Sequence, residues 1–140
     1  MSSDPDFYRV AFGSPLDLNR DVDASLKICL FTIAYDRRWS ELLALLTTGS
    51  DLGGIAGDPG WILERRPSGS NTSQSEYANW PADAEFRSYI DPTELNSEFP
   101  EAFYRRTDLL KFVKAALLAR GEEDERRIGD FKKLLETVTD

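Results

Sequence analysis

The sequence predicts an α+β fold in which a small, mainly antiparallel sheet of three to four strands packs with about four helices. Three observations predict this class: short segments rich in aromatic and β-branched residues, longer segments with apolar residues at three- and four-residue steps, and clusters of glycine and proline between them. The chain has 140 residues, of which 41% are hydrophobic. This length and composition predict one globular domain spanning residues 1–140.

The first third of the chain predicts one strand followed by two helices. Residues 7–12, Phe-Tyr-Arg-Val-Ala-Phe, are rich in strand-forming side chains and predict a strand with Val10 on its inner face. Apolar residues then recur at helical spacing and predict a helix over 21–35, although the continuous apolar run 26–35 is also compatible with a central strand. Strong helix formers predict a second helix over 39–46.

The middle of the chain predicts strands separated by loops. Glycine and proline are concentrated in residues 53–60, which predict a loop. Residues 61–65 predict a strand after it, and the serine-, glycine- and asparagine-rich residues 67–80 predict the longest loop. Alternating side chains predict a further strand over 86–90, and residues 102–105 predict a short fourth one.

The last third predicts two helices. Thr107 is a suitable N-cap, Asp108 is favoured in a first turn, and apolar residues follow at helical spacing over 109–117. After Gly121 a final helix is predicted, with the acidic residues 122–125 in its first turn. Its apolar stripe contains Ile128, Phe131, Leu135 and Val138.

The scarcity of catalytic residue types indicates a binding protein rather than an enzyme. The chain has no histidine and one cysteine, which excludes imidazole-based triads, histidine zinc sites and thiolate zinc clusters. The glycines of residues 53–57 lack the lysine and Ser/Thr of a P-loop, and Asp51 and Asp58 lack the partner ligands of an EF-hand. We therefore expect no catalytic residues, no cofactor and no metal.

The single cysteine, Cys29, is flanked by Ile28 and Leu30. A free cysteine in such an apolar setting is most often buried, and burial raises the pKa of a thiol. We expect Cys29 to fill the core and to be unreactive.

No segment predicts export or membrane insertion. The first six residues are polar and acidic, without the basic-then-apolar order of a secretory signal. No apolar stretch approaches the roughly 20 residues of a membrane span. We expect a cytoplasmic protein that does not contact a membrane.

Negative charge is concentrated in one part of the chain. There are 25 acidic and 17 basic residues, and residues 101–140 carry equal numbers of both, so the excess lies before residue 101. It is densest over residues 76–101, where seven acids accompany Arg87 alone and aromatic residues are interleaved. Repulsion within this span would be relieved by a basic protein partner. The candidate interface residues are Glu76, Tyr77, Trp80, Asp83, Glu85, Tyr89, Asp91 and Glu94.

A purely structural interpretation of the same residues stays open. In that interpretation Phe86 and Tyr89 are core residues of their strand, Trp80 covers the core, and the acids form a solvated surface. Nucleic acid is not an expected partner, because phosphate contacts need a basic patch. The arginine pairs at 37–38, 65–66 and 105–106 are scattered and are expected to be solvated or paired internally.

The C-terminal part, with Phe-Tyr-Arg-Arg-Thr-Asp-Leu-Leu-Lys-Phe-Val-Lys-Ala-Ala-Leu over residues 103–117, gives the chain a layout that resembles bacterial immunity proteins of polymorphic and contact-dependent toxin systems. The resemblance implies a cytoplasmic protein that binds a cognate toxin domain, such as a basic nuclease, and occludes its active site. It also implies carboxylates placed where the toxin expects phosphates.

Two alternative functions stand beside this one. The first is an adaptor or regulatory module that uses the apolar faces of its C-terminal helices for a partner or for self-association. The second is a small carboxylate-dependent hydrolase, which requires a deep pocket lined by at least two acids with raised pKa values.

Overall fold

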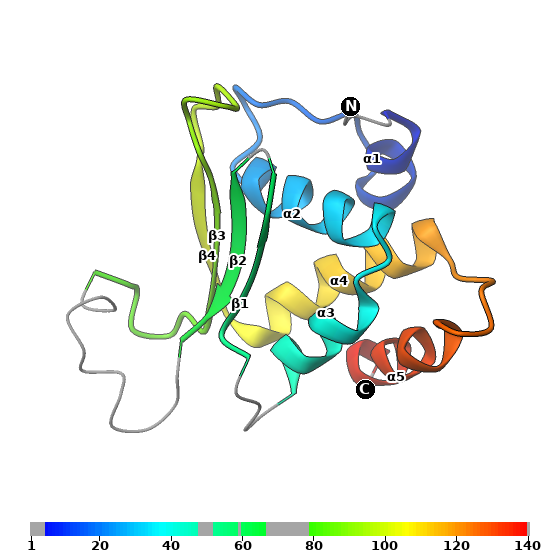
Figure 1. Ribbon diagram of the computed structural model, residues 1–140. Coiled ribbons are helices and arrows are strands. Elements are labelled where there is room, and N and C mark those ends of the chain that lie inside the picture. The colour runs from blue at the N-terminus through cyan, green and yellow to red at the C-terminus, as the bar shows by residue number, and fades with distance from the viewer. Residues whose placement is uncertain (1–4, 48–51, 59, 67–78, 140) are drawn as a thin grey trace.

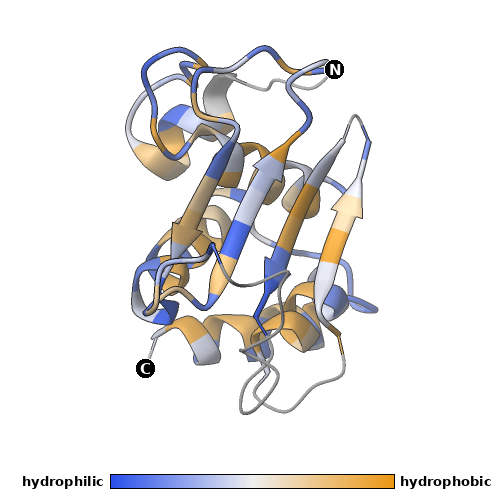
Figure 2. Cartoon of the chain, turned by 90° about the vertical axis from the view of Figure 1, so that its left-hand side faces the viewer, coloured by the Kyte–Doolittle hydropathy of each residue, from blue (hydrophilic) through white to orange (hydrophobic). Residues whose placement is uncertain are grey.

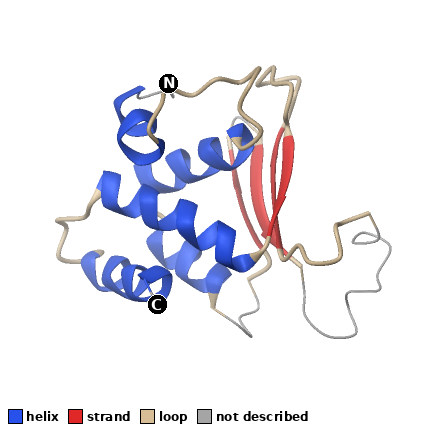
Figure 3. Cartoon of the chain, turned by 180° about the vertical axis from the view of Figure 1, so that it is seen from behind, coloured by secondary structure: helices blue, strands red, loops and turns tan. Residues whose placement is uncertain are grey.

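Five helices and a four-stranded antiparallel sheet make up the described residues of the computed structural model, which are 5–47, 52–58, 60–66 and 79–139. The helices lie on one side of the sheet, which gives a helical layer and a sheet layer (Figure 1 and Figure 3). This arrangement confirms the predicted α+β class. In chain order the elements are α1 (Pro5–Phe12), α2 (Ala24–Tyr35), α3 (Trp39–Leu46), β1 (Gly54–Gly57), β2 (Trp61–Arg65), β3 (Phe86–Ile90), β4 (Glu101–Tyr104), α4 (Arg106–Arg120) and α5 (Ile128–Thr139).

The strands follow the order β1-β2-β3-β4, and each neighbouring pair is antiparallel. Leu63 lies opposite Ile55 and Ser88, and Ser88 lies opposite Ala102. These four residues form one row across the sheet. Because side chains alternate between the two faces of a strand, the side chains of this row, and of every second residue along each strand from it, point toward the helices. The buried side chains of this inner face are Ile55, Trp61, Leu63, Phe86, Ser88, Ile90 and Tyr104.

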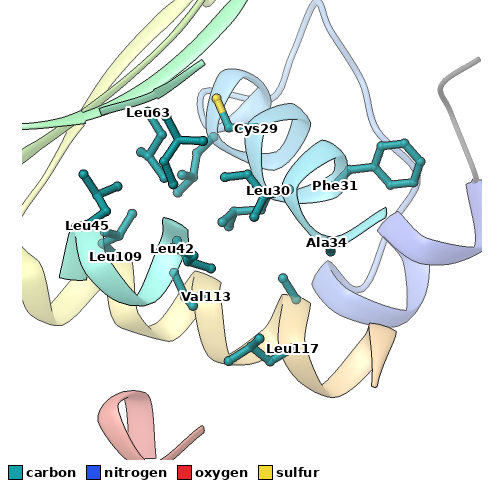
Figure 4. Packing of buried hydrophobic residues seen from close by; sticks show 14 of the residues in the cluster. Cys29, Leu30, Phe31, Ala34, Leu42, Leu45, Leu63, Leu109, Val113 and Leu117 are labelled. Carbon is teal, nitrogen blue, oxygen red and sulfur yellow. The ribbon is translucent and has the colours of Figure 1, made fainter. Parts of the chain in front are cut away.

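Helix α2 forms the centre of the core. Nine of its twelve residues are buried, and it contacts β2 and β3 as well as α3 and α4. Figure 4 shows side chains of α2, α3, α4 and the sheet meeting in one apolar cluster. A helix that is apolar on all sides has to be enclosed on all sides. The helix predicted over 21–35 is confirmed from Ala24 onward, and the strand alternative for residues 26–35 is wrong.

Two buried polar contacts fix α2 on the sheet. The hydroxyl oxygens of Ser25 on α2 and Ser88 on β3 lie 2.7 Å apart, and both residues are fully buried. At the N-terminal end of α2, the Tyr104 hydroxyl donates to Asp23 Oδ1 at 2.6 Å. Burial raises the pKa of Tyr104, and the bond to Asp23 raises it further, so the phenol stays protonated and remains a donor. These contacts define one register of α2 on β3 and β4.

Residues 7–12 are helical and belong to α1, so the strand predicted there is wrong. The rings of Phe7 and Tyr8 are buried, and each lies 5.3 Å from the ring of Phe31. Val10, expected on the inner face, is 68% exposed. The apolar residues of this segment are spaced so that they share one side of a helix, and packing of that side against α2 and α4 outweighs the strand preference of aromatic residues.

The glycine-rich residues 53–60, predicted as a loop, contain the edge strand β1. Ile55 is buried in the core, and β1 joins β2 through a tight turn in which the Gly60 N–H donates to the Gly57 carbonyl at 2.9 Å. A Cβ on Gly57 would lie 2.9 Å from the indole of Trp61, and Gly60 has a φ of +117°. The glycines are therefore needed for close approach and for the turn, although their composition indicated a loop.

The other predicted elements are confirmed, with different ends for three of them. The strands at 61–65 and 86–90 and the helix at 39–46 have the predicted bounds. The fourth strand, predicted over 102–105, spans Glu101–Tyr104 and so lies one residue earlier at both ends. Arg105 takes the N-cap position predicted for Thr107. Residues 67–78 of the predicted long loop lie outside the described residues.

The last helix, α5, begins at Ile128, so residues 122–125 precede it and do not form its first turn. Its buried stripe is Phe131, Leu134 and Val138, whereas the predicted Leu135 is half-buried. Helix α5 starts later than predicted because the residues before it are held by Glu122, whose side chain is only 1% exposed.

Glu122 links the α4–α5 connection to α3. Trp39 donates its indole N–H to Oε1 at 2.6 Å, and Oε2 accepts the backbone N–H groups of Glu123 and Asp124 at 3.0 Å each. Arg37 lies 3.9 Å from the same oxygen. Burial opposes ionisation of this carboxyl, but the hydrogen bonds and the Arg37 charge outweigh it and hold the pKa of Glu122 below its ordinary value.

Removing one hydroxyl of the buried serine pair should destabilise the fold. Ser88→Ala leaves the Ser25 hydroxyl without this partner, and we expect the free energy of unfolding to fall by about 1 to 3 kcal/mol in urea denaturation. The double variant Ser25→Ala/Ser88→Ala should lose less than the sum of the single variants, because it leaves neither hydroxyl of the pair behind. Strictly additive losses would contradict the contact.

The Glu122 carboxylate should make stability depend on pH. The pKa of Glu122 is lower in the folded state than in the unfolded state. Its contribution to the free energy of unfolding is therefore complete above the unfolded-state pKa of about 4.3 and is lost as the pH falls through the folded-state pKa. We expect Glu122→Gln to lower the free energy of unfolding at neutral pH by roughly 1 to 2 kcal/mol, with a smaller difference from wild type at acidic pH. Urea denaturation across this pH range measures it, and the exposed Glu123→Gln is the control.

Candidate binding face of the sheet

The sheet presents one face that no described helix covers. Figure 2 views this face directly, with the helices behind the strands. The strand register places on it the residues that alternate with the buried inner row. We call this surface the open face, and its side chains are Ala56, Ile62, Glu64, Arg87, Tyr89, Glu101 and Phe103.

Arg87 occupies the centre of the open face. It donates to Glu64 Oε2 and to Glu101 Oε2, each at 2.5 Å, and its guanidinium lies 4.7 Å from the centroid of the Tyr89 ring. The register explains these contacts, since Glu64 is directly opposite Arg87 and Glu101 is opposite Tyr89. Burial lowers the pKa of Arg87, but the bonds to Glu101 and Glu64 outweigh this and raise it. One cation thus fixes two carboxylates and an aromatic ring.

Trp80 adds a second aromatic group to the open face. Its ring packs edge-on against Phe103, with 5.3 Å between centroids. The Arg66 guanidinium lies 5.4 Å from the centroid of the Trp80 ring, and Arg66 also donates to the Pro81 carbonyl at 2.8 Å. Of the predicted interface residues, Trp80 and Tyr89 therefore belong to the same face. The purely structural interpretation required Trp80 to cover the core. Trp80 instead packs on Phe103, on the side of the sheet away from the helices.

The predicted acidic residues do not form one patch. Asp83 and Glu85 precede β3, whereas Asp91 and Glu94 follow it. A strand of five residues separates the two groups, which corresponds to about 17 Å. The acids therefore lie at both ends of the open face. Glu76 and Tyr77, also predicted for the interface, lie outside the described residues.

Part of the predicted repulsion is relieved inside the fold. Glu85 accepts two hydrogen bonds from Arg106, at 2.6 and 3.1 Å. Asp91 accepts from the backbone N–H and the hydroxyl of Thr93, and these bonds lower the pKa of Asp91. Other acids near the ends of β3 and β4 are exposed, and no ion pair joins them to a residue in the described ranges. These rim acids are Asp83, Glu94 and Glu98.

Most arginines of the predicted scattered pairs are used internally, as expected. Arg65 donates to the carbonyls of Leu45 and Thr47 at 2.9 and 2.7 Å, and Arg106 donates to that of Leu46 at 2.7 Å. Both therefore satisfy carbonyls at the C-terminal end of α3. These cations cannot neutralise the rim acids.

The apolar stripes of the C-terminal helices face the core. Leu109, Val113 and Leu117 of α4 are fully buried, and the stripe of α5 is buried beside them. Leu118 is the single large apolar side chain of α4 and α5 that is mostly exposed within the described residues. The surface that an adaptor would need on these helices is therefore occupied within the fold.

Cys29 has the predicted character. It is fully buried, its thiol lies 3.5 Å from the Ile62 carbonyl, and burial raises its pKa to about 12. Hydrogen bonds lower the pKa values of the Glu41, Asp91, Glu122 and Asp124 carboxyls, which gives no support to an acid that must stay protonated at neutral pH. No cluster of potential metal ligands occurs among the described residues.

Sequence reasoning missed Glu64, Arg87, Glu101 and Phe103 as members of the site. Once residues 61–65 and 86–90 are predicted as strands, the side chains of each strand divide between its two faces. The order of the strands decides which sets share a face, and that order depends on contacts distant in the sequence.

No protein-family model, curated protein or solved structure matches this chain significantly. Over the part of the chain that is described, no helix is both long and apolar enough to cross a membrane.

The cluster of Arg87 with Glu64, Glu101 and Tyr89, called the Arg87 cluster, should contribute measurably to stability. Arg87→Met keeps most of the apolar stem but leaves Glu64 and Glu101 without their shared cation, and we expect a loss of about 1 kcal/mol in urea denaturation, since the pair is partly exposed. Arg105→Met is the matched control, because its ion pair with Asp108 is 3.3 Å long and largely exposed. Equal losses in the two variants would contradict a structural role for the cluster.

Proposed function

We propose that this protein binds a basic protein domain through the open face. The observation that supports it is a sheet surface, uncovered by any described helix, that combines Tyr89, Phe103, Trp80 and Arg87 with acids at both ends. Protein interfaces are typically enriched in aromatic residues and arginine at their centre and have a polar rim. Because Arg87 and its neighbours are already held in place, little side-chain entropy would be lost on binding.

Charge favours a basic partner. Glu64 and Glu101 share one arginine, so the centre of the open face keeps a negative excess. The rim acids add to it, and the chain as a whole has a formal net charge of −8. Such a surface attracts a basic domain and accelerates its association. The same carboxylates would repel phosphates, which argues against a nucleic acid partner.

Within this proposal the partner is a toxin domain that acts in the cytoplasm, and binding neutralises it by covering its active site. The resemblance of the chain to bacterial immunity proteins motivates this choice. A nuclease domain carries basic side chains where it holds phosphates, and Glu101 with the rim acids could pair with them. The protein would then act by binding alone, without catalysis.

A display selection tests the proposal. Fragments of the source genome are displayed on phage and selected on the immobilised protein. We expect the enriched fragments to encode a basic domain that arrests growth of a test strain, with growth restored when the protein is co-expressed. Enrichment of neutral or acidic fragments, or of fragments that have no effect on growth, would contradict the proposal.

Charge reversal locates the contact surface. We expect the rim variant to slow association of the selected domain about tenfold at low salt and to weaken its salt dependence. The rim variant is Asp83→Lys/Glu94→Lys/Glu98→Lys.

A second triple variant makes the same charge change on the helical side of the molecule, among exposed residues at and before α5. It should leave the association rate near that of wild type, measured by stopped-flow fluorescence. Equal rates for the two triple variants would exclude the open face as the contact surface. This control variant is Glu123→Lys/Glu125→Lys/Glu136→Lys.

A further inference from the structure

The two edges of the sheet differ in a way that indicates how a partner docks. The Ile90 N–H donates to the Pro100 carbonyl at 2.8 Å, and β3 pairs with β4 in continuation of this bond. Backbone groups alternate in direction along an antiparallel strand. The N–H and C=O groups of Glu101 and Phe103 therefore point away from β3, toward the outer edge.

At the opposite edge, β1 is protected. Its outward carbonyl at Ala56 accepts a hydrogen bond from Arg38 Nη1 at 3.0 Å. Arg38 is held there by two bonds to Glu41, at 2.7 and 2.8 Å, and by the ring of Trp61, whose centroid is 5.5 Å from the guanidinium. Proteins commonly block edge strands in such ways, because an unpaired edge attracts another strand.

The edge of β4 has no comparable protection. No hydrogen bond within the described ranges engages the outward backbone groups of Glu101 or Phe103. β4 also contains no lysine, proline or bulge, which are three of the devices that keep an edge unpaired. The same two residues present their side chains on the open face, and the Glu101 side chain is 42% exposed.

We propose that an extended segment of the basic partner adds to the edge of β4 as a fifth strand. This inference rests on the proposed function and names its binding mode. Backbone hydrogen bonds would form with Glu101 and Phe103, and alternate side chains of the segment would lie on the open face. One of them, beside Glu101, would be basic, and the next, beside Phe103 and Trp80, would be apolar or aromatic.

A second copy of this chain is a poor occupant of the same edge. Antiparallel pairing of two β4 strands would bring the acidic Glu101 side chains of both copies to one face. Each copy also carries a formal charge of −8, so the two chains repel each other. The partner expected at this edge is therefore a basic segment with alternating apolar residues.

The probe for a test is a phage library of random eight-residue peptides, selected on the wild-type protein. We expect enriched peptides to alternate basic with apolar or aromatic residues. Phe103→Pro removes the outward N–H and should weaken their binding about tenfold more than Phe103→Ala, which keeps that N–H. Proline is tolerated at an edge position whose N–H faces solvent. Ala56→Pro, at the protected edge, should bind like wild type.

Amide hydrogen exchange of the wild-type protein gives a readout that does not depend on the folding of any variant. With an enriched peptide bound, exchange at Glu101 and Phe103 should slow, while exchange at Gly54 and Ala56 should not. Equal binding by Phe103→Pro and Phe103→Ala, unchanged exchange at β4, or failure to enrich alternating basic peptides would overturn the inference. If the selected basic domain responds to the rim variant but not to Phe103→Pro, the edge inference fails and the proposed function stands.

Discussion

The enclosure of α2 is the constraint on which the rest of the structure depends. A helix with nine of twelve residues buried needs apolar partners on every side. The sheet supplies one side, and α1, α3 and α4 supply the others. Because these helices all pack on the same face of the sheet, no described helix covers the other face. The candidate binding surface is thus a consequence of how the core is built.

The placement of the arginines connects the fold to the charge of the surface. Arg65 and Arg106 satisfy carbonyls at the end of α3, and Arg38 occupies the edge of β1. Arg38 and Arg106 also pair with Glu41 and Glu85, and none of the three arginines forms an ion pair with a rim acid within the described residues. The negative excess that the sequence concentrates before residue 101 therefore survives at the two ends of the open face, where a basic partner would meet it.

The elements that sequence reasoning predicted well have one dominant signal. Alternation predicts β3, and helical spacing predicts α3 and α4, whereas the continuous apolar run of α2 was compatible with a helix or a strand. Prediction from the sequence failed where two signals in the same segment conflict. The aromatic residues of α1 favour a strand locally, but their spacing suits a helix once a core is present. The glycines of β1 indicate a loop, yet Gly57 is required because Trp61 packs against it. Of the predicted interface residues, Trp80 and Tyr89 lie on one face of the sheet, and their role in binding stays a prediction.

By itself, the sequence determined the fold class, the burial of the single cysteine and the location of the negative excess along the chain. These properties follow from composition and short-range periodicity. Only the tertiary structure decided which acids are paired and which side chains share a face. Arg87 meets Glu64 and Glu101 across 23 and 14 residues of sequence, because strand order and register bring them together. Register depends on burial of the inner row against α2, and no local pattern records that contact.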